Sequence, residues 1–257
     1  METDLNNKVA IITGASRGIG KAIAIQLAAE GMRLVLAARS TEQLTEVAQA
    51  CKTESHIFPA DLRLEESPKK LIAFAIEKFG KIDLLVNNAG ATKRGDFLHL
   101  SEADWNDGFA LKFFSTVRCS RAAWPFLMQS KGAIVNIVGI GGRIGNAEFA
   151  IGGAVNAAIH NLTKVLADRG INDGVKVNAI NPSTIATERL QTRIDKIAVE
   201  RNIPTEQAAS EMARKLGVAR FGDPSEIASG VVFLASSLSS YCQGTILDID
   251  GGQTRTL

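Results

Sequence analysis

The 257-residue sequence predicts an α/β fold, in which seven parallel strands form one doubly wound sheet with helices on both faces. Short runs rich in β-branched residues alternate with longer stretches of helical periodicity. Several of the short runs are continuously apolar, as expected of strands that helices cover on both sides. No repeat or low-complexity linker interrupts the alternation, so we expect a single domain over residues 1–257.

The first expected strand, Val9–Thr13, is followed by apolar residues at helical spacing, among them Ile23 and Leu27. A second such helix is expected around Leu71–Phe79. The other expected strands are Leu34–Ala37, His56–Ala60, Leu84–Asn87, Ile134–Val138, Lys176–Ile180 and Ile246–Ile249. The alternation pauses over residues 187–217, a charged and helix-prone segment that is either a lid-like, substrate-side insertion or an ordinary pair of surface helices.

Composition argues against several function classes. Lys and Arg total 29 against 27 Asp and Glu, and the signs are interspersed along the chain, so we expect neither nucleic-acid nor membrane binding. The three cysteines include no C-x-x-C pair and the three histidines show no ligand spacing, so neither a disulfide framework nor a metal site is expected. Met1–Lys8 lacks a secretion signal and no apolar run approaches the roughly 20 residues of a spanning helix, which predicts a cytoplasmic protein.

Directly after the first strand the sequence reads Thr13-Gly-Ala-Ser-Arg-Gly-Ile-Gly20, and a helix is expected to follow. Gly14 suits the strand-to-helix turn, Gly18 the approach of backbone to a pyrophosphate, and Gly20 close packing of the helix on the sheet. The start of the helix offers free N–H groups and a positive dipole end to phosphates. This context predicts a Rossmann-type dinucleotide site.

The end of the second strand favours NADP(H) over NAD(H). An Asp or Glu at this place would bond the ribose hydroxyls of NAD, but Leu36-Ala-Ala-Arg-Ser40 contains no carboxylate. Arg17 and Arg39 are placed to bind a ribose 2′-phosphate through forked, charge-assisted hydrogen bonds.

From about Lys8 to Gly252 the chain resembles the short-chain dehydrogenase/reductase family, on its glycine motif, Asp61-Leu62, Asn87-Asn-Ala-Gly90, Asn181-Pro182 and Asp250-Gly-Gly252. The resemblance implies that Asp61 and Leu62 flank the adenine and that Ile185 and Thr187 hold the nicotinamide amide. The expected cofactor site comprises Gly14, Ser16, Arg17, Gly18, Ile19, Gly20, Arg39, Asp61, Leu62, Asn88, Ala89, Gly90, Pro182, Ile185 and Thr187.

Members of that family act on a substrate carbonyl with a Ser after the fifth strand, a Tyr-x-x-x-Lys motif, and an Asn on the preceding helix. Aligned on the fifth strand and the following helix, the Ser falls on Gly139, the Tyr on Gly152, the Lys on Asn156 and the Asn on Lys112. The one tyrosine of the chain, Tyr241, precedes the last strand, so no register shift restores the motif. Tyr-dependent carbonyl reduction is therefore not expected.

Lys112 and Asn156 indicate an exchange of the family's Asn and Lys between two packed helices, and they are our candidate catalytic pair. His160, one helical turn beyond Asn156, either reaches the pocket or lies on the surface or at a subunit interface. The glycines of residues 139–142 and 152–153 predict free volume beside the nicotinamide. The expected mouth of the pocket is polar and largely basic, which indicates either an anionic substrate or solvated loop residues: Lys93, Arg94, Arg143, Asn146 and Glu148.

Three functions remain open: an NADP(H)-dependent oxidoreductase with a rebuilt acid/base site, an NADP(H)-binding pseudoenzyme that acts as a partner or regulator, and a lyase or isomerase on the same scaffold. The sequence indicates neither the substrate nor the direction of reaction. The resemblance implies self-association through two long helices, about Trp105–Gln129 and Phe149–Asp168, and hence a homodimer or homotetramer. Restoring all four family side chains together is expected to create NADPH-dependent reduction of simple ketones.

Overall fold

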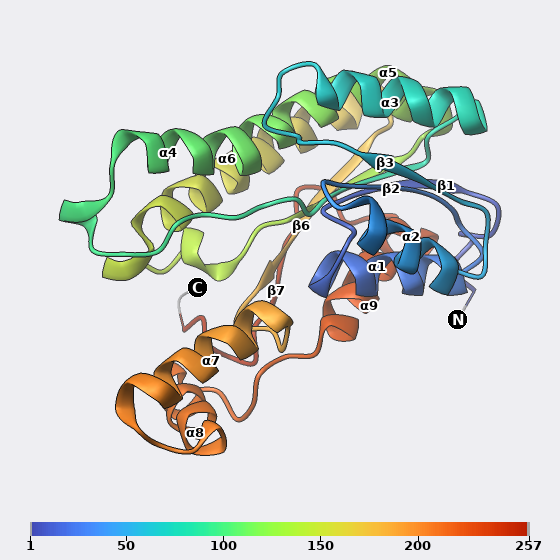
Figure 1. Cartoon of the computed structure of the whole chain (residues 1–257). Coiled ribbons are helices and arrows are strands. Elements are labelled where there is room, and N and C mark those ends of the chain that lie inside the picture. Colours follow the sequence, from blue (N-terminus) through green and yellow to red (C-terminus); the bar gives the residue numbers. More distant parts are fainter. Residues whose placement is uncertain (1, 256–257) are drawn as a thin grey trace.

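The computed structural model describes residues 2–255, and it confirms the predicted architecture. Seven parallel strands form one sheet in the order β3-β2-β1-β4-β5-β6-β7 (Figure 1). Each lies within two residues of its expected bounds: β1 Val9–Thr13, β2 Arg33–Ala38, β3 Ser55–Pro59, β4 Leu84–Asn87, β5 Ala133–Ile137, β6 Lys176–Pro182 and β7 Ile246–Ile249.

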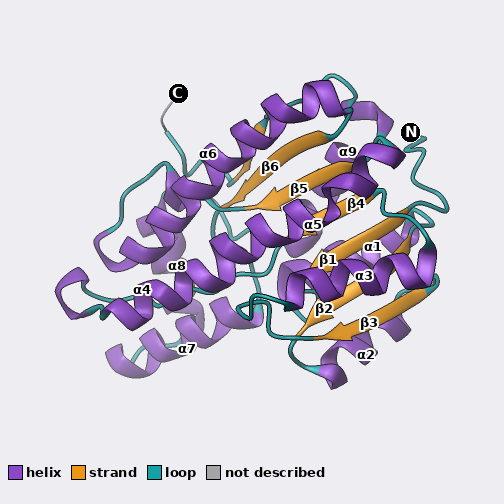
Figure 2. Ribbon diagram, turned by 90° about the horizontal axis from the view of Figure 1, so that it is seen from above, coloured by secondary structure: helices purple, strands orange, loops and turns teal. Residues whose placement is uncertain are grey.

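Helices cover both faces of the sheet, as the view from above shows (Figure 2). One face carries α1 (Gly18–Ala29), α2 (Thr41–Ala50) and α9 (Pro224–Ala235), and the other carries α3 (Ser67–Phe79), α4 (Glu102–Gly108), α5 (Ser115–Ser130) and α6 (Ala150–Asp173). Within residues 2–255 no helix has the length and apolarity to cross a bilayer, and no group of three or more His, Cys, Asp or Glu side chains gathers as a metal site would require.

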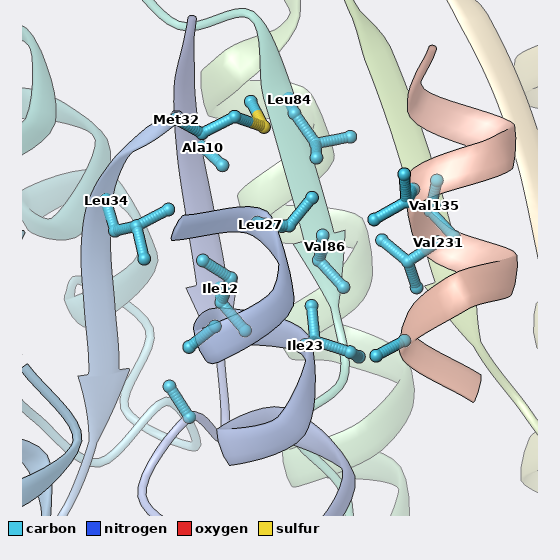
Figure 3. Packing of buried hydrophobic residues seen from close by; sticks show 14 of the residues in the cluster. Ala10, Ile12, Ile23, Leu27, Met32, Leu34, Leu84, Val86, Val135 and Val231 are labelled. Atoms are coloured by element: carbon cyan, nitrogen blue, oxygen red, sulfur yellow. The ribbon is translucent and has the colours of Figure 1, made fainter. Parts of the chain in front are cut away.

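The period-two alternation of β1 supplies both hydrophobic cores. Ile12 packs under α1 and α9 with Ile23, Leu27 and Val231 (Figure 3), whereas its neighbour Ile11 packs in the cluster beneath α3 and α5. All of these side chains are fully buried, and removing each from water stabilises the fold by roughly 1.5–3 kcal/mol. A strand with both faces buried must be apolar throughout, which is why β1 reads as a continuous apolar run.

The strand order reverses between β1 and β4, which pair with each other while their following helices lie on opposite faces. In an open α/β sheet this reversal leaves a crevice outside the carboxyl ends of the strands. The residues that follow β1, β4, β5 and β6 therefore converge on that crevice.

The expected helix over Trp105–Gln129 is interrupted. A π-helical turn at Phe109–Phe114 separates α4 from α5, and the hydroxyl of Thr116 donates to the carbonyl of Lys112 at 2.8 Å. A π turn widens the helix by one residue and is frequent at functional sites. Lys112 lies inside this turn.

Residues 187–217 contain two helices, α7 (Glu188–Arg201) and α8 (Thr205–Leu216), which share a small core of their own around Ile194 and Met212. They lie beyond the carboxyl end of the sheet, at the lower left of Figure 1.

Candidate active site

A cleft of about 620 Å³ opens at the carboxyl ends of the strands, and every residue of the expected cofactor site except Ile185 lines it. Ile185 is only 7% exposed, because its side chain packs into the core beside α9 and its backbone bridges to Gly222. A contact between the Ile185 side chain and a ligand in the cleft is therefore excluded in this arrangement.

The turn after β1 has the backbone shape that its glycines predict. Gly14 and Gly18 have φ of +67° and +55°, a region that favours glycine. A Cβ on Gly20 would lie 2.1 Å from the carbonyl oxygen of Gly14. This glycine therefore allows α1 to pack closely against the turn, whereas the sequence predicted close packing against the sheet. The side-chain amide of Asn88 donates to the carbonyls of Thr13 and Gly14 at 3.0 and 3.1 Å, which braces the turn.

The start of α1 has the features of an anion site. Arg17 precedes the helix in extended conformation without capping it through its side chain, and the first turn contains no acidic residue. The backbone N–H groups of that turn therefore face the cleft with neither a side-chain cap nor a carboxylate to compete with a phosphate. Together with the glycine turn, which a Cβ would obstruct, this cradle fits the diphosphate of a dinucleotide.

Two exposed arginines, Arg17 and Arg39, stand at the end of the cleft beside β1 and β2. Neither forms an ion pair with any residue from 2 to 255. The neighbouring Ala38 offers no carboxylate, and the hydroxyl of Ser40 accepts from the backbone N–H of Gln43 at the start of α2. The two arginines therefore make this end of the cleft basic, and residues 36–40 place no carboxylate there that would repel a 2′-phosphate.

Lys112 and Asn156 meet on the wall of the same cleft. The Nζ of Lys112 donates to the Oδ1 of Asn156 and to the backbone carbonyl of Val138, both at 2.6 Å. The aliphatic stem of Lys112 lies over Gly90, where a Cβ would come within 2.9 Å of it. The expectation that a Lys–Asn pair forms between the two helices is confirmed.

The environment of Lys112 changes its acidity. Burial, and secondarily the positive charge of Arg189, lower the pKa of Lys112 to about 8. Burial disfavours the ammonium form because it removes water from the charge. An amine with a pKa near neutrality is suited to give or take a proton at physiological pH.

Gly139 and Gly152 are held by constraints that the sequence did not show. Gly139 has a φ of +126°, which L side chains rarely adopt. A Cβ on Gly152 would lie 2.0 Å from the ring of Phe149, and one on Gly141 2.8 Å from the same ring. The prediction of free volume beside Gly152 is therefore wrong, because the ring of Phe149 fills that space.

The polar residues expected at the mouth of the pocket differ in whether they line the cleft. Arg143 pairs with Asp248 at 3.1 Å and Lys93 with Asp104 at 2.9 Å, so both charges are compensated outside the cleft. Arg94 lines the cleft and stacks over the ring of Phe149, with its Cζ 4.1 Å from the ring centroid. Asn146 also lines the cleft, whereas Glu148 does not.

His160 is half-buried in a hydrogen-bonded network behind Gly139. Its Nε2 lies 2.6 Å from the Oδ1 of Asn181, whose Nδ2 donates to Asp248 at 2.8 Å. Because that Oδ1 is an acceptor that also receives the N–H of Gly139 at 3.2 Å, Nε2 carries the proton. Burial lowers the pKa of His160, which keeps the ring neutral, so His160 supports the Gly139 loop from behind the cleft wall.

The chain is similar to known proteins over nearly its whole length. A family model described as enoyl-(acyl carrier protein) reductase matches residues 14–254. A 3-oxoacyl-[acyl-carrier-protein] reductase of Staphylococcus epidermidis is 32% identical over 251 residues, which cover 96% of this chain and 98% of that protein. The chain belongs to the short-chain dehydrogenase/reductase family of oxidoreductases.

Other relatives of this short-chain dehydrogenase/reductase cover the chain equally well. An uncharacterised oxidoreductase of Mycobacterium tuberculosis is 35% identical over 255 residues, covering 97% of this chain and 93% of that one. The crystal structure of L-sorbose reductase from Gluconobacter frateurii, complexed with NADPH and L-sorbose, has a TM-score of 0.97 at 30% identity and 100% coverage of both chains.

Phe149, Arg189 and Arg193 are among the cleft residues that the sequence interpretation of this short-chain dehydrogenase/reductase missed. Phe149 was noted only as the expected start of a helix, and Arg189 and Arg193 only as part of a charged segment. All three line the cleft, the two arginines from the first two turns of α7. Their spacing of four residues places them on one face of that helix and was the available signal. Their position favours the substrate-side interpretation of residues 187–217.

Proposed function

We propose that the protein is an NADP(H)-dependent oxidoreductase in which Lys112 and Asn156 take the place of the usual acid/base residues of its family. The observation that carries the proposal is the 2.6 Å contact between these two side chains on the wall of the dinucleotide cleft. The alignment of the family's Ser and Tyr with Gly139 and Gly152 leaves these two positions without a titratable side chain.

The glycine turn and the start of α1 would hold the diphosphate, and Asp61, Leu62, Ala89 and Gly90 would line the adenosine and ribose positions. A nicotinamide cofactor supplies or accepts a hydride when bound. The protein must then orient the substrate and move a proton, and both tasks require polar side chains near the reacting carbon.

Lys112 has the hydrogen-bonding capacity for this task. An ammonium group has three N–H donors, and the carbonyl of Val138 and the amide of Asn156 accept two of them. The third donor remains for a substrate oxygen, to which Lys112 would deliver its proton during reduction. The Oδ1 of Asn156 accepts a hydrogen bond from Lys112. The Nδ2–H group of Asn156 can therefore donate to the substrate oxygen.

The relatives support reduction over lyase or isomerase chemistry. The family model and the Staphylococcus epidermidis relative are described as reductases, and the sorbose reductase structure contains NADPH with a sugar substrate. The test is a fluorescence titration with NADPH, alongside NADPH oxidation assays with carbonyl, imine and enoyl substrates. We expect binding with turnover of at least one carbonyl class. NADPH binding without turnover of any class would favour the pseudoenzyme.

The preference for NADP(H) is expected to depend on Arg39. Arg39→Ala should weaken NADPH binding by about 10- to 100-fold, because a lost charge-assisted hydrogen bond costs about 1.5–3 kcal/mol, while NADH affinity should stay unchanged. Lys21→Ala removes an exposed cation of α1 outside the cleft and serves as the control in the same titration. An equal loss for NADPH and NADH, or no loss at all, would contradict the assignment of Arg39.

We also propose that two chains associate through α5 and α6. These helices carry exposed apolar side chains, with Met128 41%, Val165 57% and Ile171 69% exposed. Self-complementary faces of this kind close about a two-fold axis, which gives a homodimer or homotetramer. Light scattering at micromolar concentration is expected to show such a species. A monomer under these conditions would contradict the proposal.

A further inference from the structure

The cleft contains more basic side chains than the proposed binding of the cofactor phosphates requires. Among residues 2–255, two acidic side chains line it, Asp61 and Glu188, and Asp61 is paired with Arg63 at 3.3 Å. A concave site of one sign concentrates ligands of the opposite sign. Six basic side chains line the same cleft: Arg17, Arg39, Arg94, Lys112, Arg189 and Arg193.

The arginines divide by position. Arg17 and Arg39 lie at the end where the 2′-phosphate is proposed. Arg189 lines the cleft with its Nη2 3.5 Å from the carbonyl of Gly90. Burial is the main cause of its lowered pKa, and the charge of Arg17 is the second cause. Arg94 and Arg193 also line the cleft, and no anion has been assigned to them.

Arg193 lies close enough to Arg94 for its positive charge to disfavour the charged form of Arg94. Burial first, and then the charge of Arg193, lower the pKa of Arg94, which the carboxylate of Glu148 only partly offsets. Neither guanidinium has an ion-pair partner in the part of the chain that the structure describes. The repulsion between the two guanidiniums is relieved when an anion binds between them.

A continuous wall connects Arg94 with the Lys112–Asn156 pair. Arg94 stacks on Phe149, whose ring fills the space beside Gly141 and Gly152. A Cβ on Gly141 would in turn lie 3.4 Å from the amide nitrogen of Asn156. The apolar side chains of Ile140 and Ile144 line the same cleft.

We propose that Arg94 and Arg193 bind an anionic group, a carboxylate or a phosphate, on a substrate whose carbonyl faces Lys112 and Asn156. The inference rests on the proposed function, because it places the reacting carbonyl at that pair. The planar fork of a guanidinium matches either anion through two parallel hydrogen bonds. Ile140, Ile144 and Phe149 suit the carbon skeleton between the two polar ends.

The test is isothermal titration calorimetry of the protein loaded with NADP⁺, which has no hydride to transfer to a ketone, with para-acetylbenzoate and para-acetylphenyl phosphate as ligands. Methyl para-acetylbenzoate is the neutral match. We expect the anionic ketones to bind at least about tenfold more tightly than the ester, since hydrogen bonds to charged groups are the stronger ones. Comparison of the two anions shows which one the site prefers.

Two variants assign the effect to the two arginines. The double variant Arg94→Gln, Arg193→Gln removes both charges and keeps part of each aliphatic stem over its neighbours. It is expected to lose the preference for the anions and to keep its affinity for the ester and for NADPH. Lys93→Ala is the matched control, because this adjacent cation pairs with Asp104 and does not line the cleft.

The outcomes separate this inference from the proposed function. Selective binding of the anions without turnover of any ketone would support the anion site and count against the Lys112 chemistry. Turnover with equal affinity for acid and ester, or a preference that survives the double variant, would overturn the anion site. If NADP⁺ does not bind, the same titration of the free protein with para-acetylbenzoate still decides whether the arginines bind anions.

Discussion

Lys112→Met is expected to lower kcat for NADPH-dependent reduction by about 10²- to 10⁴-fold, the usual contribution of a positioned general acid. Methionine keeps an unbranched stem beside Gly90 but has no proton to give. NADPH affinity should change little, because methionine keeps the apolar contact over Gly90 and leaves the glycine turn that would hold the diphosphate untouched. Stopped-flow turnover and a fluorescence titration measure the two quantities separately.

The role of Lys112 as a proton donor also predicts how the reaction rate changes with pH. Reduction requires the ammonium form of Lys112, whose pKa is about 8, so the rate should be level below pH 8 and fall about tenfold for each unit above it. Oxidation in the reverse direction requires the neutral amine, so its rate should rise up to the same pKa and then level off. Lys112→Met should lose this inflection in any residual activity.

A second variant separates proton transfer from electrostatics. Lys112→Arg keeps a positive charge in the cleft but does not release its proton below about pH 12. Activity that survives in Lys112→Arg would mean that Lys112 only polarises the substrate. Activity within a few-fold of wild type in Lys112→Met would show that the proton comes from elsewhere and that the proposed role is wrong.

The fold and the glycine turn were predictable because their signals are local. A strand buried on both faces is apolar along its length, and the left-handed conformation at Gly14 favours glycine, so each feature is visible within a few residues of sequence. The pairing of Lys112 with Asn156 was predictable only through the family resemblance, since the two lie 44 residues apart.

The remaining parts of the site depend on tertiary packing. Phe149 fills the space beside Gly152 because of the rotamer it adopts at the start of α6, which no sequence spacing specifies. Arg189 and Arg193 reach the cleft only because α7 lies at its edge. The Ile185 side chain packs into the core where the chain bridges to Gly222, so the predicted contact of this residue with the nicotinamide amide would have to come from its backbone.

The position of Phe149 changes what restoring the family side chains should do. The fourfold variant Gly139→Ser, Gly152→Tyr, Asn156→Lys, Lys112→Asn is now expected to be destabilised and inactive on ketones. Overpacking a filled space costs about 1–3 kcal/mol, and a Cβ at position 152 would stand 2.0 Å from the Phe149 ring. A serine at position 139, where φ is +126°, adds strain on the order of 1–3 kcal/mol.

A fifth change should relieve most of this conflict. Adding Phe149→Ala to the fourfold variant opens the space that the tyrosine ring needs, so we expect partial recovery of the melting temperature and the appearance of NADPH-dependent ketone reduction. In a domain of this size about 1 kcal/mol corresponds to roughly 2–4 °C in Tm, so thermal unfolding resolves the difference between the two variants.

Gly145→Ala is the control for glycine replacement in this region, because a Cβ there meets nothing within 4 Å and its φ is not positive. It should leave the melting temperature close to that of the wild type. A fourfold variant that is as stable as the wild type would show that Phe149 moves aside at little cost. A stable, NADPH-binding fivefold variant that remains inert on ketones would show that more than these five side chains separates this cleft from that of a Tyr-dependent reductase, and the arginines of α7 and Arg94 would then be the next residues to change.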